Sequence, residues 1–183
     1  MRAVPTSRYL LFAAIVVVGT TVDLASKRWV FDRLGMPYQR PSVWIVDEIF
    51  GFTTSLNEGA LFGLGQGLGI VYAGLSITAA CGIAAWLFLA GAATDRLLTV
   101  ALAAVTAGIL GNLYDRLGLP GLIWAGEPVY AVRDWLHFKI DPIIDWPIFN
   151  IADSLLLCGA GLLVWHAWRS SPAVTAAAEV EPN

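Results

Sequence analysis

The chain has 183 residues, of which 57% are hydrophobic and only 14% are charged, and its mean hydropathy is +0.68. This balance excludes an ordinary soluble domain and indicates an integral membrane protein. The formal net charge is −3 and the longest basic run is Lys27-Arg28, which argues against a nucleic-acid-binding protein and against an electrostatically bound partner.

Four apolar stretches are long enough to cross a membrane, because a helix needs about 20 residues to span a hydrocarbon core of about 30 Å. The predicted spans cover residues 9–31, 68–90, 97–114 and 149–168. Charges interrupt only the body of the first span, at Asp23 and Lys27. Arg2 and Arg8 before this span are also typical of a secretory signal, but three further spans favour a membrane helix.

An even number of spans places both termini on one side of the membrane and segments 32–67 and 115–148 on the other. The link at 91–96 is short, which makes the second and third spans antiparallel neighbours. We therefore predict an all-α membrane protein: a four-transmembrane-helix antiparallel bundle forming a single integral membrane domain over residues 1–168. Residues 169–183 have the composition of a disordered C-terminal tail. Counting basic residues near the span ends does not fix the orientation.

The first long connection also predicts β structure. Residues 42–46 and 49–54 are β-branched and aromatic runs separated by Asp47-Glu48, a pattern typical of a hairpin. Tryptophans recur in both long connections, at Trp44, Trp124 and Trp135, and amphipathic rings of this kind favour a membrane interface. The sequence thus predicts a small β platform resting on the membrane surface.

Polar residues gather where the third span ends and the fourth begins. Asn112, Asp115 and Arg116 share one helical turn, and Asn150 and Asp153 lie three residues apart. One span runs toward this side and the next returns from it, so the two clusters face one pocket at the membrane boundary. Carboxylates are costly in such a place, which marks them as candidates for function.

Two carboxyl groups brought together share one proton and titrate as a pair, which is the arrangement of aspartic peptidases. The ionised member takes a proton from water, and the protonated member hydrogen-bonds the scissile carbonyl oxygen. Spacing alone leaves other interpretations open. In a structural interpretation, Asp115 pairs with Arg116, and Asp153 stabilises the N-terminus of a helix. In another, the intramembrane polar groups belong to a transporter or a proton relay. A non-catalytic membrane scaffold is a further alternative.

Other chemistries have less support. Ser26-Lys27 contains the residues of a serine/lysine dyad, but adjacent helical residues point apart. His137 and His166 are far apart in the topology and lack a ligand cluster, which argues against a metal site. The glycine-rich segment 63–69 has no phosphate-loop lysine and is expected to be a flexible entrance to the second span.

Three strings resemble the lipoprotein signal peptidases, the type II signal peptidases of bacterial membranes. They are GN-x-x-DR at 111–116, V-x-D at 132–134 and FN-x-AD at 149–153. Two further strings match: D-x-x-SK at 23–27 and N-x-GA-x-FG at 57–63. Five motifs in this order around four spans cover nearly the whole chain, and together they are highly specific although each alone is weak.

The resemblance implies roles for individual residues. The catalytic pair maps to Asp134 and Asp153, and Asp115 becomes a supporting residue that is expected to be held by Arg116. Asp141 and Asp145 match no motif and are expected to be solvated loop residues. The positions that the resemblance assigns to substrate binding or to support of the site are Asp23, Lys27, Asn57, Gly59, Gly108, Asn112, Asp115, Arg116, Asn150 and Ala152.

The implied activity is removal of the signal peptide from a prolipoprotein, with the cut just before a cysteine that carries diacylglycerol. The resemblance implies no cofactor and no metal, and it implies inhibition by globomycin, a cyclic peptide antibiotic. It places the protein in the bacterial cytoplasmic (inner) membrane as a multi-pass protein with both termini cytoplasmic. The active site then lies toward the outer leaflet, and the β platform lies on the periplasmic side.

The chain departs from the family pattern at three positions. Arg133 stands where an apolar residue is usual, Trp135 replaces a phenylalanine and Ala107 replaces a glycine. Consecutive residues of an extended segment face opposite ways, so Arg133 is expected to point to the lipid headgroups. In the alternative, the guanidinium turns inward and lowers the pKa of Asp134.

Overall fold

The computed structural model describes residues 3–59 and 65–170. Its helices are α1 (Thr6–Leu34), α2 (Gly69–Ala84), α3 (Arg96–Arg116) and α4 (Ile151–Ser170); a π-helical turn η2 (Ala85–Leu89) extends α2, and a 3-10 turn η3 (Ala92–Thr94) precedes α3. Its strands are β1 (Val43–Val46), β2 (Phe50–Asn57), β3 (Ile123–Trp124), β4 (Glu127–Pro128), β5 (Val132–Ile140) and β6 (Ile144–Phe149).

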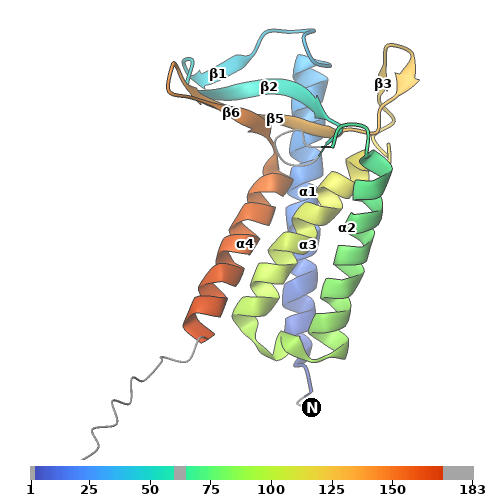
Figure 1. The fold of residues 1–183 in the computed structure, drawn as a ribbon, viewed down its shortest axis with the longest axis vertical. Coiled ribbons are helices and arrows are strands. Elements are labelled where there is room, and N and C mark those ends of the chain that lie inside the picture. The colour runs from blue at the N-terminus through green and yellow to red at the C-terminus, as the bar shows by residue number, and fades with distance from the viewer. Residues whose placement is uncertain (1–2, 60–64, 171–183) are drawn as a thin grey trace, which may run out of the picture.

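Four helices in the described residues are long and apolar enough to cross a membrane: α1, α2 together with η2, α3 and α4. They lie side by side along their length, and the strands gather at one end of the group (Figure 1). We call this the sheet end. The helix of the first span begins before residue 9 and continues past residue 31, so it is longer than the predicted span.

α3 is the central helix of the group. In its most apolar stretch 67% of the residues are buried, whereas in the corresponding stretches of the other helices 6 to 11% of the residues are buried. α3 packs against α1, α2 and α4, and small side chains such as Ala101, Ala103 and Ala107 allow these helices to approach it. Asp95 begins α3 as its N-cap, because its side chain accepts a hydrogen bond from the Leu98 amide at 2.9 Å.

The sheet end consists of a four-stranded antiparallel sheet in the order β1-β2-β5-β6 and a separate β3-β4 hairpin. The predicted hairpin at 42–54 is confirmed as β1 and β2. The description of the fold as all-α is imprecise, because β5 and β6 from the second connection join β1 and β2 in a four-stranded sheet. The pairing of β2 with β5 sets Ser55 opposite Asp134, which fixes this aspartate at the sheet end.

The predicted fourth span is displaced at its start, because Phe149 is the last residue of β6 and α4 begins at Ile151. At its other end α4 continues through Arg169 and Ser170, which the sequence had assigned to the tail. The rest of the predicted disordered tail, residues 171–183, lies outside the described residues. So do residues 60–64, which include part of the motif at 57–63 and the start of the glycine-rich segment at 63–69. Gly65 and Gly67 lie before α2 and adopt positive φ angles of 67° and 80°.

Candidate active site

The junction between β6 and α4 forms the first part of the site. The Asn150 side-chain oxygen accepts a hydrogen bond from the Asp153 amide at 2.9 Å, and Asp153 Oδ2 accepts one from the Asn150 amide at 3.1 Å. This reciprocal pair is a capping box, which satisfies two amides that the first turn of a helix leaves unpaired. Asn150 is therefore the N-cap of α4, and Asp153 keeps its other oxygen, Oδ1, for the neighbouring helix.

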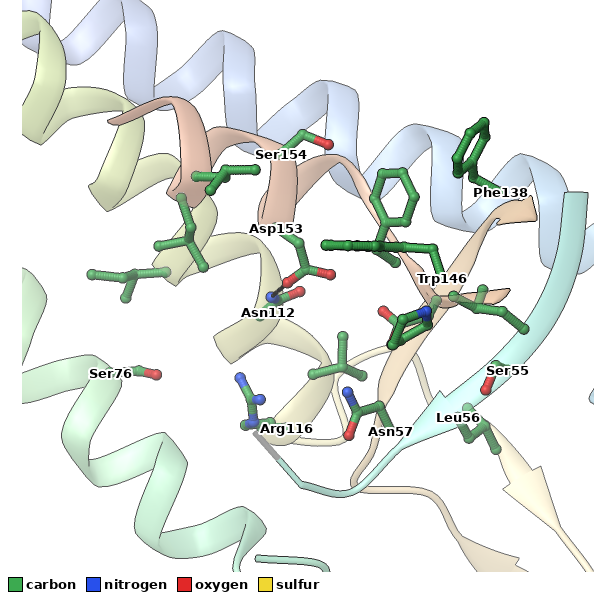
Figure 2. Close-up of a pocket in the computed structure, with 18 of the residues that line it drawn as sticks. Ser55, Leu56, Asn57, Ser76, Asn112, Arg116, Phe138, Trp146, Asp153 and Ser154 are labelled. Atoms are coloured by element: carbon green, nitrogen blue, oxygen red, sulfur yellow. Dashed lines mark hydrogen bonds between the residues drawn. The ribbon is translucent and has the colours of Figure 1, made fainter. Parts of the chain in front are cut away.

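Asn112 of α3 joins this capping box to the rest of the site. Its Nδ2 donates to Asp153 Oδ1 at 2.8 Å, and its Oδ1 accepts from Asn150 Nδ2 at 3.1 Å. In Figure 2 the side chains of Asn112 and Asp153 point toward one another across the α3–α4 contact. The two helix ends are thus joined by amide-to-carboxylate bonds, as expected from their placement in the sequence.

Asp134 reaches the same network from β5. It is 2% exposed, and its Oδ1 accepts a hydrogen bond from Asn150 Nδ2 at 2.5 Å. The side chain of Asn57, at the end of β2, also hydrogen-bonds this carboxyl group. Burial, followed by the charge of Asp153, raises the pKa of Asp134 from its ordinary value to about 8. We call Asn112, Asn150, Asp134 and Asp153 the pocket layer.

A second group of side chains lies behind the pocket layer, and we call it the charged layer: Asp23, Lys27, Asp115 and Arg133. The Lys27 ammonium lies 2.8 Å from Asp23 Oδ2 and 3.1 Å from Asp115 Oδ2, and all three side chains are fully buried. Lys27 also donates to Asn112 Oδ1 at 2.8 Å, which connects the two layers. Two acids and two bases balance the formal charge, as a buried ionic cluster requires.

The position of Arg133 corrects two expectations from the sequence. Arg133 does not point to the lipid headgroups; it is 5% exposed, and its Nε and Nη2 donate to Asp115 Oδ1 at 3.0 and 2.8 Å. Asp115 is therefore held by Lys27 and Arg133 and not by Arg116. The sequence offered one signal for the pairing of Arg133 with Asp115. Arg133 stands where the family usually has an apolar residue, and Asp115 is a carboxylate at the end of an apolar span that needs a cation.

Arg116 has a different environment. Its Nη2 donates to the Gly59 carbonyl oxygen at 3.0 Å, and its guanidinium lies 5.5 Å from the centre of the Tyr72 ring. Gly59 in turn donates its amide to Asn57 Oδ1 at 2.9 Å. Arg116 thereby joins α3 to α2 and to the end of β2, beside the cavity of the site (Figure 2).

Gly108 and Ala152 serve the packing of α3 against α4. A Cβ atom on Gly108 would lie 2.4 Å from the Ala152 carbonyl oxygen, so only glycine permits this approach. Ala152 is fully buried, and its amide donates to Asp23 Oδ1 at 2.8 Å. Gly111 is constrained in the same way, because its Cβ would lie 2.4 Å from Asp23 Oδ2. These contacts explain the closeness of the charged layer to the start of α4.

A cavity of about 1000 Å³ opens at the pocket layer. Asp134, Asp153, Asn57 and Arg116 give it a polar wall. The remaining lining is mostly apolar and comes from the sheet and the helices, including Phe138, Trp146, Ile148, Phe149, Ile109, Leu156 and Leu157. Figure 2 shows Ser76 of α2 across the cavity from Asn112 and Asp153. The cavity thus combines carboxyl groups with an apolar surface that suits a lipid or an apolar peptide.

The remaining candidates lie away from this cavity. Asp141 and Asp145 are exposed and pair with Lys139 and His137 of β5, which confirms that they are solvated residues. The Ser26 hydroxyl donates to the Asp23 carbonyl oxygen at 2.8 Å, so the structure gives the serine/lysine dyad no support.

Comparisons with known proteins agree on one family. The sequence profile of signal peptidase (SPase) II matches residues 15–169. A lipoprotein signal peptidase from Rhodopirellula baltica is 46% identical over 165 residues, which cover 88% of this chain and 73% of that protein. A lipoprotein signal peptidase from Yersinia enterocolitica is 33% identical over 178 residues, with 92% and 91% covered.

The fold is also found in solved structures of bacterial membrane enzymes. One aligns with a TM-score of 0.72 at 24% identity and covers 94% of both chains. Another aligns with a TM-score of 0.70 at 25% identity and covers 87% of this chain and 94% of that one. Sheet and helices together are therefore an arrangement that this chain has in common with known membrane enzymes.

Proposed function

The chain belongs to the signal peptidase II family, and from that premise we propose that Asp134 and Asp153 are its catalytic pair. Members of this family are aspartic peptidases that remove signal peptides from prolipoproteins, and this chain is such an enzyme, with a prolipoprotein as its substrate. One observation carries the assignment: both carboxyl groups line one cavity, and two asparagines link them. Among residues 3–59 and 65–170, no basic side chain forms an ion pair with either carboxylate.

The two carboxyl groups take different parts in the reaction. Asp134 is the protonated member and hydrogen-bonds the oxygen of the scissile carbonyl, an assignment supported by its raised pKa of about 8. Asp153 is the ionised member and takes a proton from the attacking water. Asn112 and Asn150 hold both carboxyl groups, so the pair is in place before substrate binds.

The cavity also favours a particular substrate. Its polar wall accepts the peptide bond, and its apolar lining accepts hydrocarbon and an apolar signal helix. We propose that the enzyme cuts just before a cysteine modified with diacylglycerol, whose acyl chains stay in the bilayer during cleavage. Globomycin is expected to bind in the same cavity and to inhibit cleavage. A substrate with an unmodified cysteine, compared with the lipidated form, tests the lipid requirement.

The orientation in the membrane is a further part of this proposal. We propose a single integral membrane domain, an antiparallel four-helix bundle in the bacterial cytoplasmic membrane with both termini in the cytoplasm. The sheet end then faces the periplasm, and the catalytic pair lies at the outer leaflet, where water reaches it. A membrane-impermeant thiol reagent tests this topology in two variants, Tyr38→Cys in the sheet end and Thr94→Cys at the opposite end. In intact spheroplasts the cysteine at position 38 should react with the reagent, and the cysteine at position 94 should not.

The direct test of the catalytic pair uses purified protein and a lipidated prolipoprotein. Asp134→Asn and Asp153→Asn should each reduce kcat by about 10² to 10⁴-fold, the usual contribution of general acid–base catalysis. Asp145→Asn, which removes an exposed carboxylate from β6, is the matched control and should cleave normally. Full activity of either pocket-layer variant, with the membrane-inserted protein folded, would refute the assignment.

The alternative of a transporter or proton relay has no comparable support. The polar side chains of both layers gather at the sheet end of the helices, and the opposite half of α3 is lined with residues such as Ala101 and Leu102. A relay needs polar groups distributed along the membrane path.

A further inference from the structure

Arg133 makes an unusually complete contact with one carboxylate. Its Nε and Nη2 donate to Asp115 Oδ1 at 3.0 and 2.8 Å, and its own amide donates to Asp115 Oδ2 at 3.1 Å. Side chain and main chain of one residue thus hold both oxygens of Asp115, which lies in the last turn of α3. This contact fastens the start of β5 to the end of α3.

The next residue along β5 is Asp134. Successive side chains of a strand point to opposite faces, so an anchor on Arg133 fixes the direction in which Asp134 leaves the strand. Arg133 contacts Asp115 within the charged layer, whereas Asp134 contacts Asn150 and lines the cavity. Any movement of β5 relative to α3 therefore moves the carboxyl group of Asp134 relative to the helix that carries Asn112.

Arg133 also completes the charge of its layer. Without it, the two carboxylates Asp23 and Asp115 would have only Lys27 between them. The Lys27 ammonium lies 2.8 Å from Asp23 Oδ2 and 3.1 Å from Asp115 Oδ2, and it donates a hydrogen bond to Asn112 Oδ1 at 2.8 Å. Because Arg133 neutralises part of the negative charge of Asp115, Lys27 is not drawn away from Asn112. The Nδ2 of Asn112 in turn donates a hydrogen bond to Asp153.

We propose that Arg133 is a positioning residue for peptide cleavage. The hydrogen bonds from Arg133 to Asp115 fix the position of β5 and so of Asp134. The positive charge of Arg133 leaves Lys27 bound to Asn112, which in turn donates to Asp153. Arg133 itself touches no reacting atom. The inference rests on the proposed catalytic roles of Asp134 and Asp153, and it assigns this chain a support that an apolar residue at position 133 cannot provide.

The test compares Arg133→Met, Arg133→Lys and a matched control, Lys139→Met. Lys139 is a cation on the same strand, but its partner is the exposed Asp141. Arg133→Met should lower kcat by about 10- to 100-fold with little change in KM, because misplaced reacting groups slow the chemical step. Arg133→Lys retains the charge without the two hydrogen bonds from one guanidinium, so its kcat should fall measurably, by about tenfold at most. Lys139→Met should have the kcat of the unmodified enzyme.

A double-substitution cycle separates positioning from a general loss of stability. If Arg133 acts through Asp115, the protein that carries both Arg133→Met and Asp115→Asn should have a kcat no lower than that of the slower of the two single variants. All rates are measured per folded molecule, taken from the monodisperse fraction in detergent. If Arg133→Met fails to fold, Arg133→Lys alone decides: a reduced kcat at unchanged KM supports the inference, and an unchanged kcat overturns it.

The remaining outcomes are equally decisive. Normal kcat in Arg133→Met, or losses that multiply in the cycle, would overturn the inference. Asp134→Asn distinguishes this failure from a failure of the proposed function. If Asp134→Asn is inactive while Arg133→Met is normal, only the role of Arg133 falls; if Asp134→Asn is active, the proposed function itself falls.

Discussion

Asp115 and Asp134 are both buried aspartates at the sheet end, yet their surroundings differ in kind. Asp115 is fully buried and forms ion pairs with Lys27 and Arg133. Asp134 receives amide hydrogen bonds, lies near the like charge of Asp153 and lines a cavity. A carboxylate neutralised by fixed cations stabilises a fold, whereas one beside a second carboxylate can hold or release a proton at neutral pH.

The comparison extends to the two layers. The charged layer joins α1, α3 and β5, and its four side chains are not part of the cavity lining. The pocket layer presents Asp134 and Asp153 to the cavity. It is joined to the charged layer by the hydrogen bond from Lys27 to Asn112 and, along β5, by the adjacent positions of Arg133 and Asp134. We therefore expect substitutions in the charged layer to affect stability first and those in the pocket layer to affect catalysis first.

The largest expected effect is on stability, at Asp115. Asp115→Asn removes the charge that two buried cations share and should lower the free energy of unfolding by about 3 to 5 kcal/mol. Thermal unfolding in detergent measures the change. The control is Asp32→Asn, since Asp32 is a 70% exposed carboxylate of α1 paired with Arg28. Equal unfolding temperatures for the two variants would contradict the structural role of Asp115.

The next effect tests the link between the layers. Asn112→Leu removes the donor to Asp153 and the acceptor for Lys27, and kcat should fall by about 10² to 10³-fold, as for loss of an aligned catalytic hydrogen bond. Thr106→Val on the same helix is the control, because the Thr106 hydroxyl donates to the Leu102 carbonyl oxygen of α3 itself, at 2.7 Å. A kcat near normal in Asn112→Leu would show that the bond from Lys27 to Asn112 does not couple the two layers.

A smaller effect concerns the pH dependence of stability. The pKa of Asp134 is raised from 3.8 to about 8 in the folded protein, so between these values the folded state binds more protons than the unfolded state. Its contribution to stability is then fully present below the lower value and is lost as the pH rises toward the upper one. Asp134→Asn lacks this loss. The unfolding temperature of Asp134→Asn minus that of the unmodified enzyme should therefore increase as the pH rises to about 8. A difference that does not change with pH would contradict the raised pKa of Asp134.

The smallest effect is expected at the exposed aspartates. Asp141→Asn and Asp145→Asn break pairs in which the carboxylate is 64% and 68% exposed. Exposed ion pairs contribute about 0 to 1 kcal/mol, so unfolding should change by no more than this and cleavage should continue at the normal rate. A loss of cleavage in either variant would show that the site extends along the outer surface of the sheet.

The sequence predicted the helices better than the sheet, and the reason is physical. Hydropathy over about 20 residues marks a membrane helix strongly, so the four spans were found with errors of a few residues at their ends. β5 and β6 carry no comparable signal, because Arg133, Asp134, His137 and Lys139 interrupt the apolar residues of the second connection. Their pairing with β2 depends on contacts far apart in the sequence.

The polar network of the site was predicted in part. The meeting of Asn112 with Asp153 follows from two helix ends on one side of the membrane. The same topology, taken alone, favoured Asp115 as the partner of Asp153. The surroundings of Arg133 were predicted wrongly: its side chain lies in the charged layer and not at the lipid headgroups. Alternation along a strand indicates that Arg133 and Asp134 point apart, but both directions lead into the protein here, since both residues are at most 5% exposed.

A carboxyl titration tests the central claim, that Asp134 and Asp153 share a proton, most directly. Carbon-13 NMR of aspartate-labelled enzyme gives the carboxyl signals, and Asp134→Asn identifies the signal of Asp134 by its loss. We predict that this signal titrates at about pH 8 and moves to lower pH in Asp153→Asn, because Asp153 contributes to the raised pKa. Titration of Asp134 near its ordinary pKa of 3.8, unchanged by Asp153→Asn, would contradict the claim.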